Sequence, residues 1–198
     1  MVAVLLEQFR RSPPGYSPGV TLRRALADLR DVFAAGPQHG ASAALKSAEG
    51  SLSCEVRETV ERHFLMHIVG LEFILHATAA AVPGARIRVR NTGLLHRTGI
   101  VCTVTTPHRT ALKALTKRIE GDNELRDALM SLDFRRCELV GSERGWTVHI
   151  EPYGASEVVN RMPSFRRYIR LEREQAGALA GALSAFRRIL VEDGLGRG

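Results

Sequence analysis

The sequence lacks the residue spacings that mark the commoner catalytic and metal-binding motifs. Its 198 residues include three cysteines, Cys54, Cys102 and Cys137, which lie far apart and form no CxxC pair. This spacing argues against a zinc finger and against a disulfide framework. The sequence also has no Gly-x-Ser-x-Gly, no His-Glu-x-x-His and no glycine-rich phosphate loop. We therefore expect a protein of a reducing compartment, the cytoplasm, that uses no cofactor and has no recognisable catalytic residues.

Long hydrophobic runs are missing as well. The longest, residues 64–75, carries His67 and Glu72 and is far shorter than the ~20 apolar residues of a membrane-spanning helix. Residues 1–6 are apolar, but no basic segment precedes them, which argues against a signal peptide. We expect no membrane span.

Acidic residues are absent from one block of the chain. Residues 73–119 contain no aspartate or glutamate but eight lysines and arginines. Outside this block the sequence has 20 basic residues and all 21 acidic ones, so their charges nearly cancel. The block therefore accounts for the formal charge of +7. A block of one sign attracts anionic partners. Because 25 of the 28 basic residues are arginine, we attribute the choice of arginine to a GC-rich, bacterial genome rather than to phosphate recognition.

The composition, 44% apolar and 25% charged, is that of a folded globular chain long enough to bury a core. We expect a proline- and glycine-rich lead-in at residues 1–20, a single domain at 21–192 and a flexible tail at 193–198.

Hydrophobic periodicity predicts helices and strands in alternating groups. Apolar residues at helical spacing predict helices at 21–35, 109–132 and 172–191, the second bent or split at Gly121-Asp122. Strands are predicted at 63–78, 85–90, 99–106, 134–140, 146–151 and 165–171, and a loop at 38–53. Whether residues 54–70 form helix or strand stays open. The predicted fold is α+β, of order α-βββ-α-ββ(β)-α, with a mostly antiparallel sheet of five to six strands and helices packed on one face.

Two basic stripes are the candidate binding site. Alternation in residues 85–90 places Arg86, Arg88 and Arg90 on one face of a strand, about 6.5–7 Å apart. Arg109, Lys113 and Lys117 recur at i, i+4 and i+8 on the following helix. If both stripes share a face, six cations converge there. We predict a non-enzymatic domain that uses these residues to bind an acidic protein segment or a phosphate-bearing surface. The alternative is a solvated face paired with carboxylates such as Glu55, Glu58 and Glu61, or covered in a homo-oligomer.

Nucleic acid is a possible partner without support from the sequence. No Phe, Tyr or Trp lies between Phe73 and Phe134, so the basic block offers bases nothing to stack on. A second cluster does interleave aromatic residues, but Glu157, Glu172 and Glu174 lie nearby and neutralise part of it. That cluster comprises Arg161, Phe165, Arg166, Arg167, Tyr168, Arg170 and Arg173.

Two alternative functions belong to other classes of protein. His63 and His67 have i, i+4 spacing, and on a helix they could serve a small metal- or histidine-dependent enzyme. Since HxxxH needs further ligands, core histidines are the simpler interpretation, and we predict no metal site. In the other alternative, a curved sheet and the last helix enclose an apolar cavity, and the protein carries a small hydrophobic ligand.

Overall fold

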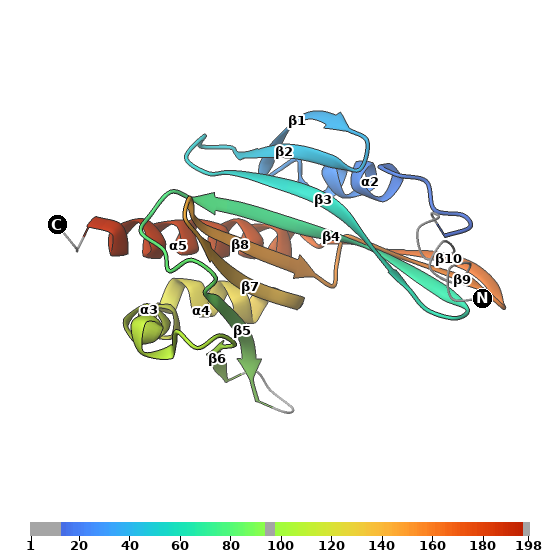
Figure 1. The fold of residues 1–198 in the computed structure, drawn as a ribbon. Coiled ribbons are helices and arrows are strands. Elements are labelled where there is room, and N and C mark those ends of the chain that lie inside the picture. The colour runs from blue at the N-terminus through green and yellow to red at the C-terminus, as the bar shows by residue number, and fades with distance from the viewer. Residues whose placement is uncertain (1–12, 94–97, 196–198) are drawn as a thin grey trace.

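The computed structural model describes residues 13–93 and 98–195, with 192–195 described by their backbone alone. These residues form ten strands in one antiparallel sheet and four helices (Figure 1). The prediction of five to six strands is therefore wrong, whereas the α+β class and the antiparallel sheet are confirmed.

The elements follow one another as two groups of strands separated by helices. In chain order they are α2 (Val20–Leu29), β1 (Phe33–His39), β2 (Ser42–Ser47), β3 (Ser53–Arg62), β4 (Met66–Ala77), β5 (Arg86–Thr92), β6 (Gly99–Val104), α3 (Arg109–Gly121), α4 (Asn123–Ser131), β7 (Phe134–Ser142), β8 (Gly145–Pro152), β9 (Ser156–Arg161), β10 (Ser164–Ile169) and α5 (Arg173–Leu195). The strand order is β1-β2-β3-β4-β8-β7-β5-β6, and β4 also pairs with β9, which pairs with β10. The sheet therefore branches at β4, whose residues 73–77 pair with β8 and 66–69 with β9.

Two of the additional strands, β1 and β2, come from segments with little β-propensity. The loop predicted at 38–53 is largely the hairpin of β1 and β2, and the helix predicted to continue to residue 35 ends at Leu29. Gly36 and Pro37 lie at the register shift between Ala35 and Gln38 in β1. Proline, which lacks an N–H, is tolerated here because β1 is an edge strand and its pairing with β2 is interrupted at this point. Within residues 54–70, whose structure the sequence left open, 54–62 belong to β3 and 66–70 to β4, and 63–65 form the turn between them.

The long helix predicted at 109–132 is divided into α3 and α4. The side chain of Asp122 accepts a hydrogen bond from the backbone N–H of Leu125 at 2.8 Å and caps α4. At the C-terminus α5 runs to Leu195, past the boundary predicted at residue 192. Parts of the predicted lead-in and tail, residues 1–12 and 196–198, lie outside the described residues.

One face of the sheet and the helices share a single core. Leu29 of α2, Leu115 of α3 and Phe186 of α5 are buried in the same cluster as Phe73 and Ile87 of the sheet. Figure 1 shows α5 running behind the central strands. Since successive residues of a strand point to opposite faces, the residues that alternate with the core positions project from the other side, which we call the open face.

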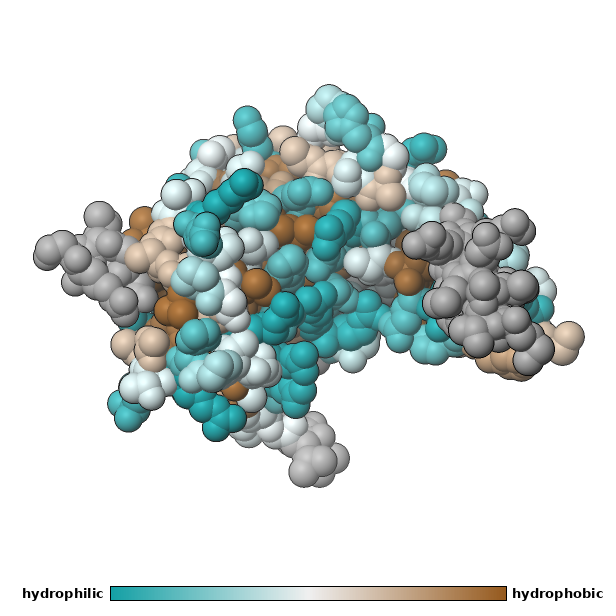
Figure 2. Space-filling view, viewed as in Figure 1, coloured by the Kyte–Doolittle hydropathy of each residue, from teal (hydrophilic) through white to brown (hydrophobic). Residues whose placement is uncertain are grey.

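The open face is largely hydrophilic across its middle (Figure 2). No helix within the described ranges is long and apolar enough to cross a membrane.

Candidate functional site

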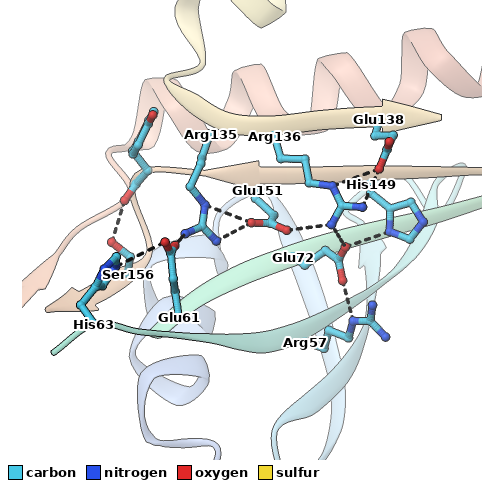
Figure 3. Close-up of polar contacts among 11 residues, drawn as sticks. Arg57, Glu61, His63, Glu72, Arg135, Arg136, Glu138, His149, Glu151 and Ser156 are labelled. Carbon is cyan, nitrogen blue, oxygen red and sulfur yellow. Dashed lines mark hydrogen bonds and ion pairs between the residues drawn. The ribbon is translucent and has the colours of Figure 1, made fainter. Parts of the chain in front are cut away.

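A row of arginines and glutamates crosses the open face of the sheet, and we call it the charge ladder (Figure 3). Three of its glutamates are almost fully buried: Glu72, Glu138 and Glu151 are 1%, 2% and 6% exposed. Its members are Arg57, Glu61, Glu72, Arg86, Arg135, Arg136, Glu138, His149 and Glu151. With four arginines and four glutamates, the ladder is balanced in charge when His149 is neutral.

Glu72 on β4 lies at the centre of the ladder. Its carboxylate accepts hydrogen bonds from Arg57 Nε at 2.5 Å and from His149 Nδ1 at 2.9 Å. Burial alone would raise the pKa of Glu72, but these two hydrogen bonds and the charges of their donors lower it to about 2. Because an ionised carboxylate can only accept, the ring nitrogen Nδ1 of His149 is the donor in this hydrogen bond.

A β-bulge directs two successive arginines to one carboxylate. The register between β7 and β8 shifts between Phe134 and Arg136. In a bulge two residues of one strand oppose one of the partner, so neighbouring side chains can reach the same group. Arg135 Nη2 lies 2.5 Å from Glu151 Oε2, and Arg136 Nη1 lies 3.2 Å from Glu151 Oε1. Arg135 also contacts Glu61, and Arg136 reaches Glu138 at 2.6 Å, so the ladder is continuous.

An apolar pocket of about 340 Å³ opens beside the Arg135 end of the ladder. It lies where β8 ends at Pro152 and the chain turns into β9. Gly70 lies in its wall, where a Cβ would be 3.2 Å from Thr59 Oγ1 and 3.8 Å from Arg135 Nη2. The apolar lining residues are Met66, Ile68, Leu71, Pro152, Val158 and Ile169, and the polar ones are Glu61, His63, Arg135, Glu151, Tyr153 and Ser156.

The predicted strand arginines lie on the open face. Arg86, Arg88 and Arg90 are exposed and alternate with the buried Ile87 and Val89, as the sequence predicts. Arg86 belongs to the charge ladder, with Nη1 3.3 Å from Glu138 Oε2. Neither Arg88 nor Arg90 has an ion pair with any carboxylate in the described part of the chain.

The predicted helix stripe lies on another side of the molecule. Arg109, Lys113 and Lys117 are exposed on α3. The apolar residues of α3 enter the core that Ile87 and Val89 face, so the arginines of β5 point away from this helix. The structure therefore places the two stripes on different sides of β5.

Two of the three carboxylates suggested as partners of the stripes have other roles. Glu58 accepts hydrogen bonds from the backbone N–H groups of Gly19 (2.9 Å) and Leu22 (2.8 Å), at the start of α2. Glu61 pairs with Arg135.

His63 and His67 are not brought together. His63 lies in the turn after β3, with Nε2 3.3 Å from Glu61 Oε1, and lines the pocket. His67 is buried on the core face of β4, and neither of its ring nitrogens has a hydrogen-bond partner. Burial, together with the nearby Arg161, lowers the pKa of His67. Within the described ranges no three His, Cys, Asp or Glu residues are placed to hold a metal ion.

The charge ladder was missed by the sequence reasoning, although part of its signal was present. Once residues 134–151 are recognised as a hairpin, opposite charges fall across its strands at Arg136 and Glu151, and Glu138 pairs in register with His149. Sequence offers no comparable signal for the bulge at Arg135 or for the pairing of β4 with β8.

The fold and this site define a class of single-sheet α+β proteins with one face covered by helices and one face open and polar. The family model described as "Protein of unknown function (DUF3156)" matches residues 28–190, and the chain belongs to this family. The matched range includes all ten strands, the ladder and the pocket. No curated protein and no solved structure matched the chain.

Proposed function

We propose that this protein is a non-enzymatic binding protein that holds a small, mostly apolar molecule in the pocket of the open face. The pocket is the observation that carries the proposal. Its volume of about 340 Å³ falls in the range of ligand sites, about 300–1,000 Å³. Such sites combine an apolar lining with a few convergent polar groups, and this pocket has both. It differs from the cavity suggested by the sequence, because α5 packs against the opposite face of the sheet.

The charges around the pocket limit the chemistry of the ligand. Arg135 is already balanced by Glu61 and Glu151, so the polar end of the pocket offers hydrogen bonds rather than net positive charge. An anionic head group would have to compete with both carboxylates for Arg135, and breaking the pair with the buried Glu151 is the costly step. The ligand that fits has an apolar body beside Ile68, Val158 and Ile169 and an uncharged end with hydroxyl or amide groups.

A substitution of Gly70 tests the proposal. In Gly70→Val the side chain enters the pocket, while a β-branched residue suits a strand. We expect the variant to lose binding of the uncharged dye Nile red, and to lose any co-purified ligand seen by native mass spectrometry.

The matched control is Gly99→Val on β6, where a Cβ meets nothing closer than Thr92 Oγ1 at 3.5 Å. This variant is expected to bind Nile red as the parent does. If folded Gly70→Val, checked by circular dichroism, retains the parent's affinity, the pocket is not the site and the proposal fails.

A specific observation favours a second binding function. Arg88 and Arg90 on β5 are exposed cations for which the described carboxylates provide no ion pair. We propose that they engage an acidic protein segment or a phosphate-bearing surface, which Arg86 can do less well beside Glu138.

We also infer a reducing, cytoplasmic setting. The three cysteines are free, and burial raises the pKa of Cys54 to about 12.

A further inference from the structure

Two hairpin ends expose large apolar side chains at one end of the sheet. The turn between β3 and β4 exposes Phe64 (93%) and Leu65 (44%), and the β9–β10 hairpin exposes Met162 (74%) and Phe165 (47%). The backbone N–H of Arg161 donates to the carbonyl of Leu65 at 2.8 Å, so the two ends lie side by side. Figure 1 shows them together at the end of the molecule opposite to the C-terminus of α5. We call these four residues the hairpin tips.

The chain around the hairpin tips is basic. Residues 62–71 and 158–171 contain five arginines and no acidic residue. Arg161 and Arg167 are exposed, and no described carboxylate forms an ion pair with either of them. Of the carboxylates that flank these segments, Glu61 is engaged by Arg135 and Glu157 by Arg24 at 2.6 Å, while Glu172 is exposed just before α5 and pairs with neither arginine. The tips therefore combine protruding apolar groups with uncompensated positive charge.

We propose that the hairpin tips insert into the surface of an anionic lipid bilayer. Phe64, Leu65 and Met162 would lie below the head groups, with Arg161 and Arg167 at the level of the lipid phosphates. A bilayer fits these tips better than a folded protein does. Side chains that protrude from two turns offer little flat area for shape complementarity, and a fluid bilayer needs none. The inference stands independently of the pocket ligand.

Cosedimentation with vesicles tests the insertion. The full chain is expected to bind vesicles that contain phosphatidylglycerol more tightly than vesicles of phosphatidylcholine alone, with the difference reduced by salt. The double variant Phe64→Ala/Met162→Ala should lower the partition coefficient on the order of tenfold or more, because each apolar side chain no longer leaves water. Arg161→Gln/Arg167→Gln should weaken binding to the anionic vesicles alone. The matched control, Val101→Ala at a 39% exposed position on β6, should change neither.

Fluorescence locates the inserted residues. Trp146 is 3% exposed and provides a constant background. On addition of anionic vesicles, the emission of Phe64→Trp should shift to the blue, and that of Val101→Trp should not.

The proposal is overturned by absence of binding to both kinds of vesicle, or by a shift in the Val101→Trp variant alone. It is also overturned if the chain forms a concentration-dependent dimer that Phe64→Ala/Met162→Ala abolishes, since the tips would then bind a second copy.

Discussion

The open face depends on glutamates that are buried and yet ionised. Glu72 stays charged because Arg57 and His149 donate directly to it. The pKa of Glu138 is also lowered, since Arg136 and Arg86 outweigh the effect of burial, which by itself would raise it. Removing one member of such a group leaves its partners poorly compensated, so these residues stabilise the sheet as a set rather than one by one.

Replacing Glu72 should change both the stability and its dependence on pH. The pKa of Glu72 is lowered from 4.5 to about 2 in the folded protein. The contribution of ionised Glu72 to the free energy of unfolding is therefore complete above pH ~4.5 and is lost as the pH falls toward 2. Glu72→Gln is expected to lower the free energy of unfolding at pH 7 by about 2 kcal/mol, less than for a fully buried pair because Arg57 is half exposed. Between pH 5 and 2 its stability should also decline less than that of the parent.

Urea denaturation over a pH series measures this effect. The control is Glu55→Gln at an exposed position of β3, where we expect a change within about 0.5 kcal/mol. Parallel stability curves for Glu72→Gln and the parent below pH 5 would show that Glu72 does not titrate as described.

At the level of secondary structure, β5 and α3 carry similar cations on different sides of the molecule. Because of this arrangement, charge reversals on β5 and on α3 can distinguish binding by a specific basic surface from an effect of the net charge of the protein. Arg88→Glu/Arg90→Glu and Lys113→Glu/Lys117→Glu alter the charge of the protein equally. If β5 is the binding surface, the strand variant should lose retention on immobilised poly-glutamate and phosphocellulose at low salt, by about tenfold or more. The helix variant should be retained like the parent, and equal losses in both would contradict a role for β5 itself.

Strands with a regular alternation of apolar and polar residues could be predicted from the sequence. Strands that are extended only because adjacent strands pair with them could not. Ile87 and Val89 alternate with arginines, and this pattern alone identifies β5. In contrast, β1 contains Gly36 and Pro37 and is a strand because β2 pairs with it. The short β9 is held between β4 and β10, a tertiary effect that local sequence does not encode. Because β9 was not among the predicted strands, the pocket could not be predicted either, since Ser156 and Val158 of β9 line it.

At the level of the whole molecule, the sheet consists of two parts joined along β4. Strands β8, β7, β5 and β6 extend from the C-terminal half of β4, and β9 and β10 extend from its N-terminal half. The chain passes from one part to the other at Gly154 and Ala155, where Ala155 has a positive φ of 55°. The pocket residues Pro152, Tyr153 and Ser156 flank this joint. We therefore expect the shape of the pocket to depend on how closely the backbone of Gly154 packs against Leu171 and Arg170.

Substitution of Gly154 tests this dependence. A Cβ at Gly154 would lie 2.9 Å from Leu171 Cδ1 and 3.0 Å from the carbonyl oxygen of Arg170, so the backbone must shift. We expect Gly154→Ala to lower the free energy of unfolding by about 1–3 kcal/mol. It should also weaken Nile red binding at temperatures where the variant remains folded.

Gly177→Ala is the matched control. In the interior of α5, a Cβ at Gly177 meets nothing within 4 Å, so alanine should stabilise the protein by up to about 1 kcal/mol. The same chemical change should thus have opposite effects on stability at two glycines, as measured by thermal and urea denaturation. If Gly154→Ala lost stability but kept full dye affinity, the joint would support the fold without shaping the pocket. Loss of both would show that the two parts of the sheet form the binding site together.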